Sequence, residues 1–161
     1  MPKDKDGFYK ISAAKDKIVR HTDPLVKEQS SKSFHLDTYC FDSNPEQSLF
    51  WSLLKDGRVK KLYFTGMLTH GQSDFYIQYI DPDSHTVRSY YPDFLFQKND
   101  DTYVIVEVKG DHEIDNPVVQ AKKTFAEAIA GASKMTYRML ESSKANAGIH
   151  SMLFEDDLQA S

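Results

Sequence analysis

Two carboxylates and a lysine lie near one another in the second half of the chain. Asp93 directly follows Pro92, thirteen residues separate it from Glu107, and Lys109 comes two positions after Glu107. Acids brought close together repel each other. A divalent cation between the two carboxylates would turn that repulsion into coordination, because hard cations take oxygen ligands. The two acids are therefore candidates for a metal site.

The residues around these acids predict that they lie on neighbouring strands. In a strand over 102–109, alternate side chains point to opposite faces, and both faces are apolar until the run ends. This pattern predicts an interior strand covered on both sides. A hairpin turn near 99–100 would place Asp93 across from Glu107, or one register step away. The alternative is an ordinary surface pair of Glu107 and Lys109, with Asp93 solvated nearby.

A helix is predicted on each side of this region. For the first, over 44–56, Ser43 or Asn44 can serve as the N-cap, and Gly57 can end the helix. The second helix is predicted over 117–131, with one apolar face. The residues expected on that face are Val118, Ala121, Phe125, Ala128 and Ile129.

The remaining periodic segments predict strands, so the expected fold class is α/β with a mixed central sheet. The predicted strands are 60–65, 74–80, 86–96 and 102–109, as an antiparallel meander. The segment "KMTYRMLES" after the second helix predicts a further strand, parallel to a central one through a right-handed crossover. Pro92 is expected to distort its strand, because proline donates no ladder hydrogen bond.

Composition bounds the class of protein. The 161 residues, 40% of them hydrophobic, suit one compact domain. Residues 1–36 are polar and are expected to form an arm or loosely packed extension, with a short strand at "GFYKI". Cys40 is the only cysteine, so an intramolecular disulfide is excluded. The N-terminus lacks an apolar leader and no window is long and apolar enough for a membrane span, which favours a cytoplasmic protein.

The net charge of −4 is not that of a strongly basic nucleic-acid binder, so any phosphate-binding surface must be local. Two basic clusters are candidates, although solvated surface charge is the more common reading of each. Their members are Lys10, Lys15, Lys17 and Arg20, and Lys55, Arg58, Lys60 and Lys61. The six histidines show no zinc-binding spacing, and the run from Asp111 to Glu113 is interpreted as a hydrophilic loop.

The spacing of Pro92-Asp93 and Glu107-Val108-Lys109 resembles the PD-(D/E)xK signature of the restriction-endonuclease-like nucleases. The predicted order of elements resembles the αβββαβ core of that superfamily. Over about residues 36–140, the stretches "FDSNPEQSLFWSLL", "YYPDFLF", "YVIVEVKGD" and "AKKTFAEAIA" resemble the C-terminal nuclease domain of type III restriction enzymes. The expected division of the chain is an extension over 1–35 and a nuclease domain over 36–161.

The resemblance implies roles for individual residues. Asp93, Glu107 and the backbone carbonyl of Val108 would bind Mg²⁺, for which Mn²⁺ would substitute. Lys109 would orient the attacking water and offset negative charge in the transition state. Glu46 matches the acid of the first helix that completes such sites. It also fits a capping box, in which its carboxylate returns to a backbone N–H.

Further residues are assigned to the surroundings of the site. Gln120 resembles the extra polar residue that many of these nucleases place near the metal. Lys122 and Lys123 could meet backbone phosphate, but a solvated helix face fits them equally well. Tyr90 and Tyr91 could stack on bases, although strand aromatics more often belong to the core.

The function that the resemblance implies is a Mg²⁺-dependent endonuclease that hydrolyses DNA in a restriction, defence or DNA-processing system. No Walker A sequence is present, so a motor, recognition or recombinase subunit is the expected partner, and a homodimer is a further option. The alternatives are a transposition or recombination nuclease that works with a partner recombinase, a non-catalytic nucleic-acid-binding member of the fold, and an unrelated structural α+β domain.

Overall fold

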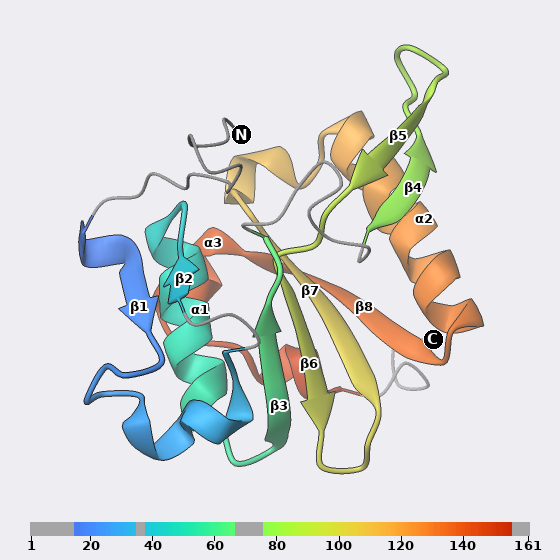
Figure 1. Cartoon of the computed structure of the whole chain (residues 1–161). Helices are drawn as coiled ribbons and strands as arrows, with labels where there is room; N and C mark the ends of the chain where they lie inside the picture. The colour runs from blue at the N-terminus through green and yellow to red at the C-terminus, as the bar shows by residue number, and fades with distance from the viewer. Residues whose placement is uncertain (1–14, 35–37, 67–75, 156–161) are drawn as a thin grey trace, which may run out of the picture.

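A four-stranded mixed sheet forms the centre of the protein, in a computed structural model that describes residues 15–34, 38–66 and 76–155 (Figure 1). Its strands, in spatial order, are β3 (Val59–Phe64), β6 (Phe94–Lys98), β7 (Tyr103–Lys109) and β8 (Met135–Glu141). β3, β6 and β7 are antiparallel, and β8 runs parallel to β7. The predicted α/β class and mixed central sheet are confirmed.

Two helices flank the sheet, as predicted, and each has a side-chain cap. α1 (Asn44–Lys55) begins after Ser43, whose hydroxyl accepts a hydrogen bond of 3.4 Å from the N–H of Glu46. α2 (Pro117–Ala132) begins after Asn116, whose side-chain oxygen accepts one of 2.9 Å from the N–H of Val118. α2 links β7 to β8, which gives the predicted crossover between parallel strands.

The interior strand β7 contributes to two separate hydrophobic clusters. Val104 and Val106 pack in the cluster that contains the buried residues of α1. Ile105 packs in the cluster that contains Ala126 and Ala130 of α2. The two helices therefore cover opposite faces of the sheet (Figure 1), and the predicted burial of both faces of this strand is confirmed.

The prediction of one strand over 86–96 is wrong. The run divides into β5 (Val87–Tyr90) and β6, with Pro92 between them. β5 pairs with β4 (Ile77–Ile80) as a separate two-stranded hairpin, so the expected meander does not include β4. In Figure 1 this hairpin lies beside α2 and projects beyond the sheet. Proline interrupts the ladder because it has no N–H to donate, which confirms the distortion expected there.

The buried stripe of α2 is rotated from the predicted one. Val119, Ala126 and Ala130 are its buried residues. Of the predicted face, Val118, Ala121 and Phe125 are partly buried and pack against the same cluster, whereas Ala128 and Ile129 are exposed, Ile129 by 41%. Apolar residues on both sides of this stripe made the helical periodicity ambiguous.

The segment 15–34 packs more closely than the expected arm. It contains β1 (Ile18–Arg20), which pairs antiparallel with β2 (Thr38–Cys40). Val19 and Val26 of this segment are 2% and 0% exposed, and both are buried in the cluster that contains the buried residues of α1. The predicted strand at "GFYKI" lies outside the described residues, and the division of the chain at residue 35 stays a prediction.

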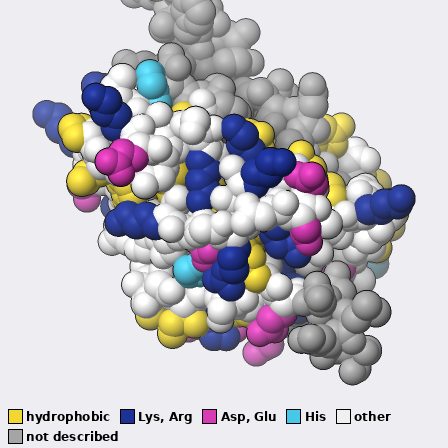
Figure 2. All heavy atoms as spheres, turned by 90° about the horizontal axis from the view of Figure 1, so that it is seen from below, with side chains coloured by type: hydrophobic (Ala, Val, Ile, Leu, Met, Phe, Trp, Pro, Cys, Tyr) yellow, Lys and Arg dark blue, Asp and Glu magenta, His cyan; other side chains and the backbone are white. Residues whose placement is uncertain are grey.

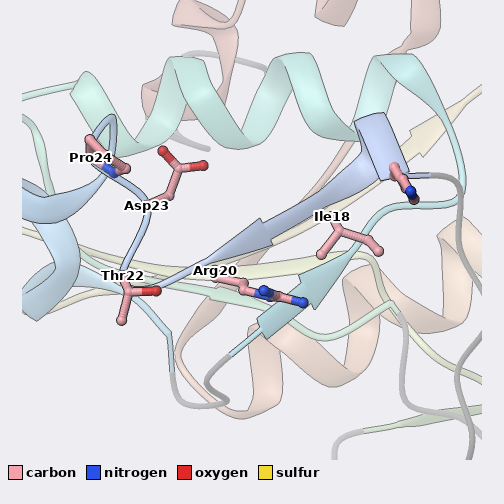
Figure 3. Close-up of a pocket in the computed structure, with 6 residues that line it drawn as sticks. Ile18, Arg20, Thr22, Asp23 and Pro24 are labelled. Atoms are coloured by element: carbon pink, nitrogen blue, oxygen red, sulfur yellow. The ribbon is translucent and has the colours of Figure 1, made fainter.

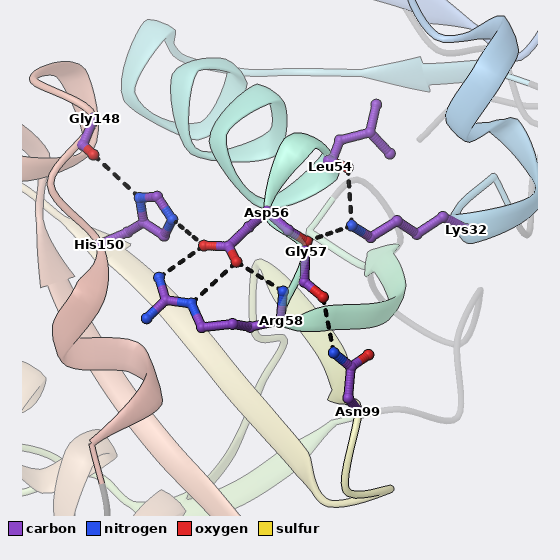
Figure 4. A network of polar contacts seen from close by, with 8 residues as sticks. All are labelled: Lys32, Leu54, Asp56, Gly57, Arg58, Asn99, Gly148 and His150. Atoms are coloured by element: carbon purple, nitrogen blue, oxygen red, sulfur yellow. Dashed lines mark hydrogen bonds and ion pairs between the residues drawn. The ribbon is translucent and has the colours of Figure 1, made fainter.

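A polar network joins the end of α1 to the C-terminal part of the chain, which contains α3 (Ser142–Asn146) and a 3-10 helix (Ser151–Phe154) (Figure 4). The Asp56 carboxylate accepts hydrogen bonds from the backbone and guanidinium of Arg58, and it contacts His150 Nε2 at 2.8 Å. Lys32 Nζ donates to the carbonyl of Asp56 at 2.6 Å.

None of the described helices is long and apolar enough to cross a membrane.

Candidate active site

Asp93 and Glu107 lie on neighbouring strands at one end of the sheet. Phe94 pairs with Val106 in the antiparallel register of β6 and β7, which places Asp93, one residue earlier, opposite Glu107. The Oδ2 atom of Asp93 accepts a hydrogen bond of 2.9 Å from the backbone N–H of Val108. The cross-strand placement predicted from the hairpin is therefore confirmed.

A glycine makes room for the Asp93 carboxylate. A Cβ atom on Gly66 would lie 2.9 Å from Asp93 Oδ1, closer than Cβ atoms pack, and 3.2 Å from the Cα atom of Asp93, which is a tight contact. The backbone carbonyl of Asp93 also accepts hydrogen bonds from Thr65 and Gly66, at 2.8 and 3.1 Å. In the sequence, the position of Gly66 directly after a predicted strand is the only signal for this role.

The electrostatic environment of the two acids favours their protonated forms. Burial above all, and then repulsion by Glu107, raises the pKa of Asp93 well above its usual range, against the hydrogen bond from Val108. Burial raises the pKa of Glu107 to about 7, while the ammonium of Lys109 opposes that shift. Glu107 is 9% exposed, and its Oε2 atom is buried without a hydrogen-bond partner. A bound cation would compensate both effects.

Lys109 lies beside this pair at the end of β7. Its Nζ atom is 3.9 Å from Glu107 Oε1, and its side chain is 23% exposed. Alternate residues of a strand share a face, so Lys109 and Glu107 point to the same side of the sheet. The three residues of the predicted motif therefore come together, with the ammonium at the partly open edge of the cluster.

Glu46 combines both of its predicted environments. Its Oε2 atom accepts a hydrogen bond of 3.1 Å from the N–H of Asp42, one residue before the N-cap Ser43, as in a capping interaction. Glu46 also lies near enough to Asp93 for repulsion to act between them. Burial first, and then Asp93, raises the pKa of Glu46 to about 7. The side chain caps α1 and lies within electrostatic reach of Asp93.

Two tyrosines lie beside Glu107: Tyr90, a predicted candidate for base stacking, and Tyr137, for which the sequence predicted no role. The hydroxyls of Tyr90 and Tyr137 are 2.9 Å apart and buried. They line a narrow recess, too small to admit a water molecule, together with Glu107, Lys109 and Lys122. Tyr90 is therefore a core residue, and it also contacts the site. The signal for Tyr137 would have been its place in β8, two residues before the partner of Glu107.

The other predicted site residues are divided between the site and its surroundings. Lys122 is in the recess. Lys123 points elsewhere and lies 4.0 Å from Glu127, one turn further along α2. The Gln120 side chain donates a hydrogen bond to the carbonyl of Ile114, which fixes the loop before α2. Tyr91 packs against Tyr76, with ring centroids 5.9 Å apart.

Two basic clusters were predicted outside the site. Among the described residues, several of their members lie next to acidic side chains. Arg58 pairs with Asp56 and Lys60 with Asp101, at 2.8 and 2.6 Å. Figure 2 shows the end of the molecule that is opposite to the carboxylates, where basic and acidic side chains alternate. A hollow of about 510 Å³ beside β1 is lined by Lys15 and Arg20, but also by Asp23 (Figure 3). None of the carboxylates of the candidate site lines it.

The donor set fits a magnesium ion bound through few protein ligands. Mg²⁺ is commonly held by one or two carboxylates, several waters and substrate phosphate. Asp93, Glu107 and the Val108 carbonyl would meet that requirement, and the unpartnered Oε2 of Glu107 is a ready ligand. The described residues contain no group of three or more His, Cys, Asp and Glu side chains arranged to hold a metal. Glu46 would therefore act through a water or through Asp93.

Comparison with known families supports the nuclease superfamily of the restriction-endonuclease-like fold. A family model described as "TnsA-like endonuclease N terminal" matches residues 69–142. The match includes Asp93, Glu107 and Lys109, and it leaves out α1 with Glu46. No curated protein and no solved structure matches the chain. The likeness to type III restriction enzymes stays a prediction.

Proposed function

We infer that the protein is a metal-dependent endonuclease that hydrolyses phosphodiester bonds of DNA. The observation that carries this inference is the convergence of a buried glutamate, a partly buried aspartate and a lysine at one end of the sheet, within the region that matches an endonuclease family. Like charges held together away from water destabilise a fold. Groups of acids placed in this way are typical of functional sites, where they bind a ligand or take part in a reaction.

In the proposed reaction, Asp93, Glu107 and the Val108 carbonyl would hold Mg²⁺, or Mn²⁺ in its place. The bound cation would supply Lewis acidity at the scissile phosphate and would lower the pKa of a nearby water. Lys109 positions that water and offsets the negative charge that develops on the phosphate oxygens. Attack by the water forms a new P–O bond as the water loses a proton to solvent. The bond to one sugar oxygen breaks, and that oxygen leaves as a hydroxyl after it takes a proton from solvent water.

The family match favours a transposition or recombination nuclease over a restriction enzyme module as the biological setting. We propose a recombinase as the partner protein, and DNA as the shared substrate. The net charge of −4 agrees with a module that gains part of its DNA affinity from another subunit. One site cuts one strand, so this chain alone is expected to nick duplex DNA slowly and in a salt-sensitive manner.

The test is cleavage of supercoiled plasmid DNA by the purified chain with Mg²⁺ or Mn²⁺. The variants Asp93→Asn, Glu107→Gln and Lys109→Gln should each lose nicking, whereas Asp100→Asn, an exposed acid at the far turn, should retain it. Equal nicking by wild type and Asp93→Asn would assign the activity to a contaminant or to other residues. Binding without cleavage under all metal conditions would favour the non-catalytic alternative.

A further inference from the structure

Lys122 is fixed beside the candidate site although its side chain extends from a helix. Its Nζ atom lies 5.6 Å from the ring centroid of Tyr79 and 5.5 Å from that of Tyr90. Aromatic faces attract ammonium groups at such distances. The residue is half-buried and lines the recess that contains Glu107 and Lys109. Lys122 therefore bridges α2 and the β4–β5 hairpin at the edge of the site.

Arg88 continues the line of positive charge from Lys122 onto the hairpin. It pairs directly with Tyr79 in the antiparallel register of β4 and β5. Its Nε atom is 3.0 Å from Asp81 Oδ2, and Asp81 is itself held by the N–H groups of Asp83 and Ser84. The guanidinium carries further donors on its terminal nitrogens, and the side chain is 56% exposed. Arg88 is thus oriented and open to a ligand.

The grouping of these cations is unfavourable in the free protein. Burial lowers the pKa of Lys122, the charge of Lys109 lowers it further, and Arg88 acts in the same direction against Glu107 and Asp81. A polyanion would relieve this repulsion. Lys123, the next residue of α2, does not line the recess, and its Nζ atom lies 4.0 Å from Glu127 Oε1.

We propose that Lys109, Lys122 and Arg88 form a basic track that binds the phosphate backbone of the DNA strand on one side of the scissile bond. The strand leaves the carboxylates along the junction of α2 with the β4–β5 hairpin, which projects beyond the sheet (Figure 1). This inference rests on the proposed function, and it adds the path of the substrate. It also assigns Lys122 a position next to the reacting phosphate and Arg88 a position farther away.

The track is tested by DNA binding without hydrolysis, which separates it from the proposed activity. Fluorescence anisotropy of a labelled duplex is measured with EDTA across a salt series for wild type, Lys122→Gln, Arg88→Gln and the matched control Lys123→Gln. Loss of one charged hydrogen bond lowers affinity about tenfold. Loss of one phosphate contact lowers the salt slope by about 0.9. Both effects are expected for Lys122→Gln and Arg88→Gln, with wild-type behaviour for Lys123→Gln.

Charge-retaining variants exclude a purely structural effect. Lys122→Arg and Arg88→Lys should bind within a few-fold of wild type, and thermal unfolding should show that all variants are folded. Wild-type affinity and salt slope for folded Lys122→Gln and Arg88→Gln would overturn the track, even if the protein cuts DNA. The expected binding losses in a protein that never cuts DNA would support the track and contradict the proposed activity.

Discussion

The Asp93 carboxylate is held between two backbone neighbours, since its Oδ2 atom accepts a hydrogen bond from Val108 N–H and its Oδ1 atom faces the Cα of Gly66. The first contact ties Asp93 to the strand that carries Glu107. The second leaves no space for a side chain at residue 66. The orientation of the first proposed metal ligand therefore depends on a residue that would never coordinate the metal.

Gly66→Ala should impair the site more than the fold. The new methyl group would lie 2.9 Å from Asp93 Oδ1, so either the carboxylate or the strand end must move. A displacement of about 1 Å at a reacting group can reduce a rate about 100-fold. We expect nicking to fall by about that factor, measured with Mn²⁺ on plasmid DNA.

The matched control for this prediction is Gly57→Ala, because a Cβ atom on Gly57 meets nothing within 4 Å. Its nicking rate should remain at the wild-type value. Wild-type nicking by Gly66→Ala would mean that Asp93 tolerates displacement or that it takes no part in the reaction.

Asp56→Ala should destabilise the fold without acting on the site directly. The Asp56 side chain is 10% exposed, and its carboxylate accepts hydrogen bonds from Arg58 and His150 (Figure 4). Its removal leaves these donors without their carboxylate, which costs about 2–4 kcal/mol in the free energy of unfolding. Urea unfolding measures this loss.

Asp115→Ala provides the comparison, because Asp115 is an exposed acid and its loss should change the free energy of unfolding by less than about 0.5 kcal/mol. At a temperature where Asp56→Ala is fully folded, its DNA nicking should equal that of wild type. A stability loss no larger than that of Asp115→Ala would show that the network contributes little.

The sequence was sufficient for the elements that position the carboxylates. β7 has an apolar pattern on both faces, and the turn near residue 100 fixes its register with β6. Both helices carry local capping signals. These features depend on residues close in the chain, which is why the position of Asp93 opposite Glu107 was predictable.

Features that depend on distant contacts were not predictable in the same way. The distance between Gly66 and Asp93 follows from the pairing of β3 with β6, and the tyrosine pair joins β5 to β8. Periodicity also could not separate Lys122 from Lys123, because α2 covers the sheet with a stripe rotated from the predicted one. Only the packed helix shows which lysine faces the site.

The acids of the site should make stability decrease as pH rises. The pKa values of Glu46 and Glu107 are about 7 in the folded protein, against about 4.5 when unperturbed. Between these values the folded state binds more protons than the unfolded state, so the free energy of unfolding falls from pH 4.5 to pH 7 and then levels off. Removing one acid should therefore stabilise the metal-free protein at pH 8.

Glu107→Gln is expected to raise the free energy of unfolding by about 2–3 kcal/mol at pH 8 and to leave it nearly unchanged at pH 4. Urea unfolding in EDTA at both pH values measures the difference. Glu155→Gln, at an exposed position, should match wild type at both. An equal effect of Glu107→Gln at pH 4 and pH 8 would show that packing, and not ionisation, causes it.

A divalent cation should reverse this penalty in the wild type, because it binds the deprotonated carboxylates of the folded state only. Ligand at one hundred times its dissociation constant stabilises a protein by about 2.7 kcal/mol. Thermal unfolding with and without Mn²⁺ should therefore show a higher Tm at pH 8. At pH 5 the increase should disappear, since Glu107, with a pKa of about 7, is then protonated. Glu107→Gln should show no increase at either pH, whereas Glu127→Gln, on the outer side of α2, should respond like wild type. An equal Tm increase in Glu107→Gln would place the cation elsewhere and separate the carboxylate pair from metal binding.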